Sequence, residues 1–225
     1  MASFDAATPL EEWRPVPPVK TAWSAFVRHV APALSRAALV SLFALFAWSN
    51  YSHWRATGQP AGLGTTLLEG WVAALFLVRR PTRDISLRPV AWIAAPIGSF
   101  AMLLARPEGG GLPQLPCEAL QLAGLAIALV SLGTLGRSFG LVAANRGVKT
   151  RGLYGVVRHP TYAGYLLTYV GYVLENPSVR NVVLLCLGTA FQLVRINEEE
   201  RLLAADAHYS EYRQSVRYRL IPLVY

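Results

Sequence analysis

Apolar and polar residues alternate in long blocks along this chain. Arg-rich or Gly/Pro-rich connectors separate stretches that consist almost entirely of apolar residues. These stretches cover about residues 32–51, 63–78, 89–104, 117–136, 161–174 and 179–194. A helix needs roughly 20 residues to cross the hydrocarbon core of a bilayer. The pattern therefore predicts an all-α integral membrane protein with about five to six transmembrane helices.

The last two apolar stretches are short, and only the residues ENPS separate them. As helices they would extend about 21 and 24 Å, against a hydrocarbon core of roughly 30 Å. They predict a tight helical hairpin that is either extended by flanking residues or partly re-entrant. Residues 195–225 are charged and amphipathic, and we interpret them as a cytoplasmic surface tail.

The basic residues predict the orientation in the membrane. Arg and Lys concentrate before the first stretch, between the second and third, after the fourth and in the tail. Basic residues favour the cytoplasmic side, so both termini and the connector 136–159 are expected there. We divide the chain into a cytoplasmic tail (1–30), N-terminal transmembrane helices (31–135) and a core of connector, hairpin and C-terminal tail (136–225). The Ala/Arg-rich composition is typical of a bacterial inner-membrane protein.

Composition argues against several other classes. The chain has 225 residues, of which 53% are hydrophobic and 15% are charged, and its net charge is +8. Soluble domains carry about 25% charged residues. A basic chain can bind nucleic acid, but here the arginines lie at the ends of apolar blocks, where membrane orientation requires them, so no nucleic-acid partner is predicted. The first 30 residues lack the early apolar region of a signal peptide.

The cysteines and histidines suggest neither a disulfide framework nor a metal site. Cys117 and Cys186 lie inside apolar stretches and are interpreted as buried, reduced thiols. The four histidines are dispersed along the sequence, so no metal is predicted. Glu69 is a carboxyl inside a predicted membrane helix, and both a functional and a structural role remain open for it. Small residues in the fourth stretch, such as Gly124, permit close helix packing and a homodimer.

Residues 158–164, RHPTYAG, concentrate polar chemistry at the start of an apolar stretch. Proline is tolerated in the first turn of a helix and disfavours helical backbone at the residue before it. A helix is therefore predicted to start at about Pro160, with Arg158 and His159 on non-helical backbone. The free N–H groups of the first turn and the two basic side chains together suit an anion.

The same cytoplasmic side is predicted to carry a glutamate run and several tyrosines. Hydrolase, metalloprotease and dinucleotide-binding motifs do not occur. A cationic corner, carboxylates and aromatic rings suit a zwitterionic ligand with an aromatic group. Its carboxylate would meet arginine, its amine or ribose hydroxyls would meet glutamate, and an adenine would stack on tyrosine.

Several segments in this order resemble the isoprenylcysteine carboxyl methyltransferase family, whose core is shared by membrane-embedded phospholipid N-methyltransferases. They are VKTRGLYGVVRHPTYAG (148–164), RINEEERLL (195–203), YSEY (209–212) and VRYRLIP (216–222). The resemblance covers about residues 136–222. It implies S-adenosylmethionine as the methyl donor, in a pocket capped by the C-terminal tail. It also implies a lipophilic acceptor that enters from the bilayer.

The resemblance further implies which residues form the site. The cofactor pocket would include Gly152, Tyr154, His159, Tyr162, Gly164, Glu199, Glu200 and Tyr212. The catalytic candidates are Arg158, Arg195 and Glu199. Glu198 leaves the register of the glutamate pair open by one residue. The segment AADAHYSEY (204–212) departs from the Phe-Gly that many members have before the tyrosines, so the shape of the cofactor lid stays open.

The acceptor also stays open. A carboxylate acceptor, such as a prenylcysteine-like group, needs only a cation such as Arg158 or Arg195 to hold it. An amine or hydroxyl acceptor on a lipid or other hydrophobic molecule needs a base, for which a glutamate is the candidate. The alternatives are a nicotinamide-dependent membrane reductase with a fold like that of the sterol reductases, or a non-catalytic membrane scaffold.

Overall fold

The computed structural model describes residues 31–82 and 84–224, and the predicted cytoplasmic tail at residues 1–30 lies outside this part. Residues 36–225 form one compact unit. The α-helices are α2 (Ala31–Thr57), α3 (Pro60–Val78), α4 (Pro89–Phe100), α5 (Gln114–Leu135), α6 (Pro160–Glu175), α7 (Val179–Leu203) and α8 (Ala207–Ser215). Short 3₁₀ turns η2 (Ala101–Leu104), η3 (Gly136–Ser138) and η4 (Gly152–Gly155) complete them. The described residues contain no β-strand, which confirms the predicted all-α class.

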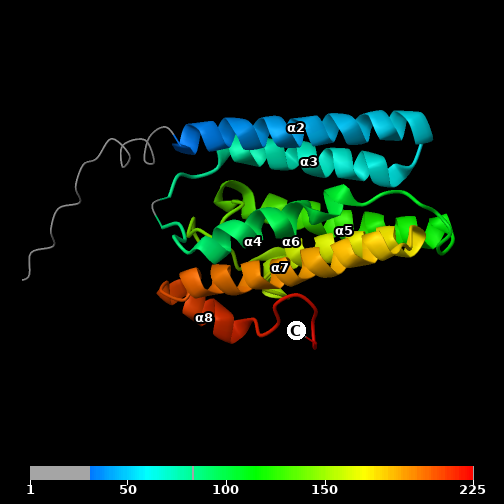
Figure 1. The fold of residues 1–225 in the computed structure, drawn as a ribbon. Helices are drawn as coiled ribbons and strands as arrows, with labels where there is room; N and C mark the ends of the chain where they lie inside the picture. Colours follow the sequence, from blue (N-terminus) through cyan, green and yellow to red (C-terminus); the bar gives the residue numbers. More distant parts are fainter. Residues whose placement is uncertain (1–30, 83, 225) are drawn as a thin grey trace, which may run out of the picture. The chain divides into compact units, whose positions relative to one another are not determined.

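Within the described residues, four helices are long and apolar enough to cross a membrane. They cover Ala33–Thr57, Pro60–Val78, Gln114–Ser138 and Val179–Leu203, and the segment Pro89–Leu104 is a shorter apolar helix. The protein is thus an integral membrane protein, as predicted. Helix α5 packs on α3 and α6, and α4 packs on α7 (Figure 1). Helix α6 has 16 residues and reaches about 24 Å, so it is short, as predicted.

Proline marks the start of three of these helices. Helices α3, α4 and α6 each carry a proline in their first turn, where its missing N–H costs no hydrogen bond. Helix α6 begins at Pro160, as the sequence predicted. Its cap, His159, has φ −128° and ψ 58°, outside the helical region. The imidazole therefore lies at the point where the connector turns into the helix.

Helix α7 is longer than predicted. The sequence suggested an apolar stretch that ends at 194 and a surface tail from 195, but α7 continues unbroken to Leu203. The extension is stable because three of its charged residues, Arg195, Glu198 and Glu200, are buried and paired with other groups. A charge can be buried when a partner compensates it. The glutamate run is therefore part of the interior, which corrects the prediction of a surface helix.

Helices α5 and α6 approach each other through glycines. A Cβ at Gly164 would lie 2.7 Å from both the Ala128 nitrogen and the Gly124 oxygen, and one at Gly171 would lie 2.8 Å from the Cys117 oxygen. Small residues allow such backbone contact between membrane helices. The structure thus places Gly164, a candidate for the cofactor pocket, against α5. At Gly133 an added Cβ would meet nothing within 4 Å.

The connector between α3 and α4 is hydrogen-bonded to the connector between α5 and α6. The Ser86 amide donates to the Ala143 carbonyl at 2.9 Å, and the Asn145 amide donates to the Asp84 carbonyl at 2.9 Å. The Thr82 hydroxyl donates to the Asn145 carbonyl at 2.7 Å. These bonds fix the connector between α5 and α6, from which several residues reach the candidate site.

Substitution of Gly164 by alanine should separate α5 and α6. The added Cβ meets backbone atoms that cannot rotate away, so we expect a loss of stability on the order of 1–3 kcal/mol. The control Gly133→Ala adds the same methyl group to a helix with free space around it and should be neutral or slightly stabilising. Thermal unfolding in detergent compares the two variants. Equal midpoints for both would contradict the close packing at Gly164.

Candidate active site

A cavity of about 120 Å³ lies at the N-terminal end of α6 and the C-terminal end of α7. The connector between α5 and α6 and the tyrosines of α8 complete its walls. Of the candidate residues, those that line it are Tyr154, Arg158, His159, Tyr162, Arg195, Glu199 and Tyr212. Gly152, Gly164 and Glu200 do not line it. The structure therefore brings most, but not all, of the residues predicted from the sequence to one cavity, and their roles stay predictions.

The corner at Arg158 and His159 holds the C-terminal segment by backbone hydrogen bonds. The Arg158 amide donates to the Tyr218 carbonyl at 2.9 Å, and the His159 amide donates to the Arg219 carbonyl at 2.8 Å. The chain after α8 therefore runs back past the start of α6. This arrangement puts the tail and the connector on one side of the cavity.

The side chain of Arg158 reinforces this attachment. Its Nε donates to Glu200 Oε1 at 2.8 Å, and its Nη1 donates to the carbonyls of Val216 and Arg217, each at 2.8 Å. The Arg158 and Glu200 side chains are each 5% exposed, so this is a buried ion pair. Arg158 borders the cavity, but these bonds are directed toward the tail.

Glu200 is surrounded by basic groups. In addition to Arg158, His159 Nε2 lies 3.2 Å from Glu200 Oε1, and Arg219 Nη2 lies 2.9 Å from Glu200 Oε2. A buried carboxylate needs such partners because it has lost its hydration. Both oxygens of Glu200 are therefore occupied within the protein, which explains why Glu200 does not face the cavity.

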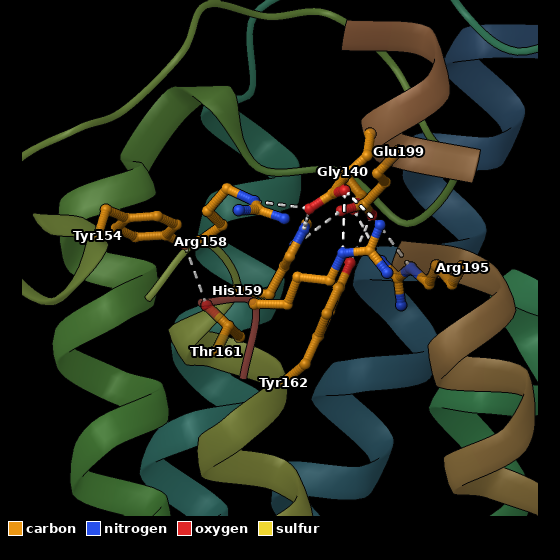
Figure 2. Close-up of polar contacts among 10 residues, drawn as sticks. Gly140, Tyr154, Arg158, His159, Thr161, Tyr162, Arg195 and Glu199 are labelled. Carbon is orange, nitrogen blue, oxygen red and sulfur yellow. Dashed lines mark hydrogen bonds and ion pairs between the residues drawn. The ribbon is translucent and has the colours of Figure 1, made fainter. Parts of the chain in front are cut away.

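Glu199 is the glutamate of the run that faces the cavity. Its Oε1 accepts hydrogen bonds from the Tyr162 hydroxyl and from Arg195 Nε, the latter at 3.3 Å (Figure 2). Its Oε2 lies 3.8 Å from His159 Nδ1, and the side chain is 21% exposed. Glu198 lies elsewhere, 3.0 Å from Arg88. The structure thus answers the question of register: three successive glutamates have three different environments.

Arg195 connects the elements around the cavity. Its Nη1 donates to the Ser99 hydroxyl of α4 at 2.8 Å, and its Nη2 donates to the Gly140 carbonyl of the connector at 3.1 Å (Figure 2). Its guanidinium carbon lies 4.9 Å from the centroid of the Tyr162 ring. The His159 ring stacks on the Tyr162 ring, with 5.6 Å between the two centroids. Arg195, Tyr162 and Glu199 therefore hold one another in fixed positions.

The tyrosines around the cavity have different functions in the structure. The Tyr154 hydroxyl lies 3.2 Å from Thr161 Oγ1, and burial raises the pKa of Tyr154 to about 12, so it remains a neutral phenol. The Tyr212 hydroxyl donates to the Tyr154 carbonyl at 2.7 Å, so its proton is engaged in a hydrogen bond within the protein. Tyr209 lines the same cavity, and its buried hydroxyl forms no hydrogen bond of normal geometry, although Glu200 lies close enough to influence it. Burial also raises the pKa of Tyr209, which keeps it a potential donor.

The sequence analysis did not predict some of the residues that line the cavity. Tyr209 could have been found, because it precedes Tyr212 by three positions and such residues share one face of a helix. Arg146 gave no such signal, since it comes from an irregular connector. It lines the cavity, and burial together with the neighbouring Arg79 lowers its pKa to about 10. Among the described residues, no group of three His, Cys, Asp or Glu side chains could hold a metal ion.

Comparison with known proteins identifies this region. Residues 119–210 match the family model of the phospholipid methyltransferases. The match confirms the resemblance seen in the sequence, because that family is related to the isoprenylcysteine carboxyl methyltransferases. The match covers less than half of the chain, and together with the apolar helices it supports a membrane methyltransferase in general. A comparison with curated proteins gives no match.

Removal of the Arg158 side chain should release the C-terminal tail. Arg158→Ala leaves Glu200 with one partner fewer and removes the bonds to the tail carbonyls, so we expect a loss of about 3 kcal/mol in unfolding free energy. Arg201→Ala is the control, because the Arg201 side chain is 62% exposed and 3.9 Å from Glu198, where a pair contributes at most about 1 kcal/mol. Limited proteolysis measures cleavage after α7. An equally protected tail in both variants would contradict the attachment.

Proposed function

We propose that this membrane methyltransferase takes its methyl group from S-adenosylmethionine and transfers it to a lipophilic acceptor that reaches the site from the bilayer. The observation that carries the proposal is Glu199, a partly open carboxylate in a cavity whose other charged lining residues are basic and whose wall includes several aromatic rings. The cavity lies at the end of a helix that is long and apolar enough to cross the membrane. A polar donor and a lipophilic acceptor can meet only at such a boundary.

The chemistry of the lining fits the donor. Its amino acid part carries a carboxylate and an amine, and its nucleoside part carries hydroxyls and an adenine. Arg146 supplies a half-buried cation for the carboxylate, and Glu199 Oε2 accepts from the amine or from ribose hydroxyls. The Tyr209 hydroxyl, which forms no hydrogen bond of normal geometry, is a buried group that a ligand would satisfy. When bound, S-adenosylmethionine supplies a methyl group on a positively charged sulfur.

The main task of the protein's residues is then to orient the donor and the acceptor and to enclose them. Methyl transfer is an in-line displacement, so rate depends on alignment and on exclusion of water. Arg195 and Tyr162 fix the orientation of Glu199, which can hold a proton when the acceptor is an amine or alcohol. Arg158, a catalytic candidate from the sequence, acts here as a positioning residue that keeps the tail over the cavity.

The orientation in the membrane is part of the same proposal. Arg79, Arg80 and Arg146 lie near the end of α3 on the side of the cavity, where basic residues favour the cytoplasm. The cavity and the C-terminal tail would then face the compartment that contains the methyl donor. We place the N-terminus on the same side and the protein in a bacterial inner membrane.

Binding of S-adenosylhomocysteine, the product form of the donor, tests the proposal. Calorimetry on detergent-purified protein should show micromolar binding, and Glu199→Gln should weaken it about tenfold, because a charged hydrogen-bond acceptor is lost. Glu198→Gln is the matched control from the neighbouring position and should bind as the unmodified protein does, since Glu198 does not line the cavity. Absence of binding by folded protein, or binding of NADPH instead, would contradict the proposal.

Two tyrosine variants separate contact with the donor from support of the fold. Tyr209→Phe removes a hydroxyl that forms no hydrogen bond of normal geometry, so stability should be unchanged while S-adenosylhomocysteine binds about fivefold more weakly. Tyr212→Phe leaves the Tyr154 carbonyl without its donor, and it should lower stability by about 1 kcal/mol. Calorimetry and thermal unfolding on the same samples measure both quantities. Exchanged phenotypes would show that Tyr212 contacts the donor.

A further inference from the structure

Two arginines without carboxylate partners lie where the N-terminal part of α2 meets the C-terminal end of α3. Arg36 belongs to α2, and Arg79 directly follows the last residue of α3. Among the described residues, no Asp or Glu side chain forms an ion pair with either guanidinium. Neither arginine lines the candidate active site. The positive charge at this place is therefore not explained by the chemistry of that cavity.

The packing of α2 on α3 brings the two arginines together. The Phe43 ring of α2 stacks on the Phe76 ring of α3, with 5.6 Å between the centroids. Arg36 precedes Phe43 by seven residues, so it lies on the same face of α2, closer to the N-terminus. Arg79 follows Phe76 by three residues, and its guanidinium carbon lies 5.3 Å from the centroid of that ring. Since successive helices joined by two residues run antiparallel, both arginines extend from the phenylalanine contact toward the same end.

This pair lacks both an acceptor and a negative charge. Burial and, after it, the charge of Arg36 lower the pKa of Arg79, so the two cations are close enough to repel each other. Arg36 Nε is buried and has no hydrogen-bond partner in the described part of the chain. Buried polar groups are nearly always satisfied, and an exception calls for a ligand, an ion or a water. An anion between the guanidiniums would supply the acceptor and the charge at once.

Two further arginines add positive charge beside Arg79. Arg137 Nε donates to the Val78 carbonyl at 3.0 Å, and Arg146 Nε donates to the Arg80 carbonyl at 3.2 Å. These bonds hold both side chains at the C-terminal end of α3, where they also satisfy carbonyl groups that the helix leaves free. The surroundings of the pair are thus strongly basic, which favours an anion over a neutral ligand.

We propose that Arg36 and Arg79 bind a phosphate group at a site separate from the candidate active site. A guanidinium donates two parallel N–H groups to phosphate and is well suited to it. The pair lies near the ends of two helices that are long and apolar enough to cross the membrane, and basic pockets at such places bind phospholipid headgroups. An anionic phospholipid of the surrounding leaflet, or phosphate from the water, offers the same chemical group.

A bound phosphate would hold α2 on the rest of the bundle. Without the anion, two positive charges repel each other across the contact between α2 and α3, and with it both are attracted to one group between them. The supply of the anion would then set the stability of this contact. The proposal does not depend on the proposed function, because it concerns neither the methyl donor nor its acceptor.

Thermal unfolding of the full-length protein in detergent micelles tests the site with three probes: dioleoylphosphatidylglycerol, dioleoylphosphatidylcholine and inorganic phosphate. We expect phosphatidylglycerol at saturation to raise the unfolding midpoint by about 5 °C, and phosphatidylcholine, whose headgroup has no net charge, by at most about 1 °C. A rise with phosphatidylglycerol alone assigns a lipid headgroup, and an equal rise with inorganic phosphate assigns the free anion. No rise with any probe, or equal rises with both lipids, would overturn the proposal.

Two variants locate the response. Arg36→Gln should lose the rise with the anion, while its midpoint without the anion is unchanged or slightly higher, because one of two like charges is gone. Arg80→Gln is the matched control, since it removes the same charge from the neighbouring, exposed position and should keep most of the rise. An undiminished rise in Arg36→Gln, or an equal loss in both variants, would contradict a site at Arg36 and Arg79.

Binding of S-adenosylhomocysteine is measured on the same samples and keeps the two proposals apart. Arg36→Gln should bind it as the unmodified protein does, because Arg36 does not line the candidate active site. Absence of this binding in the unmodified protein would contradict the proposed function alone, and the response to phosphate would still assign the arginine site.

Discussion

The buried carboxylate of Glu200 is the interaction on which the arrangement of the site depends. It lies between Arg158, His159 and Arg219, which come from the start of α6 and from the C-terminal tail. A carboxylate without hydration is stable only with such partners, and each partner is in turn held by the carboxylate. The network therefore ties α6, α7 and the tail into one corner, and the cavity forms beside it.

Helix α7 unites the membrane part with this corner. Its first half is apolar, and its last turns carry the charged residues of the site without a break in the helix. Because the helix is continuous, the distance between Arg195 and Glu199 is fixed by helical geometry rather than by a flexible loop. The proposed transfer from a donor in water to an acceptor in lipid would require a rigid support of this kind.

The sequence predicted the apolar helices and the start of α6 at Pro160, because these depend on local rules of proline geometry and hydropathy. The family resemblance added seven of the residues that line the cavity. Neither could predict that α7 continues to Leu203, since the charges of that segment look solvated until their distant partners are known. For the same reason, the sequence could not predict that Glu198, Glu199 and Glu200 have separate environments. Gly164 was predicted to belong to the cofactor pocket. It does not line the cavity, and it packs against the backbone of α5, which no local pattern reveals.

Transfer of a labelled methyl group would decide whether this corner is an active site. Membranes that contain the protein are incubated with S-adenosylmethionine labelled in its methyl group, and the lipids are extracted and counted. A methyltransferase with the site described above puts label into the organic phase, and Glu199→Gln loses that label while Glu198→Gln keeps it. Label that stays at the level of membranes without the protein would contradict this function for the cavity.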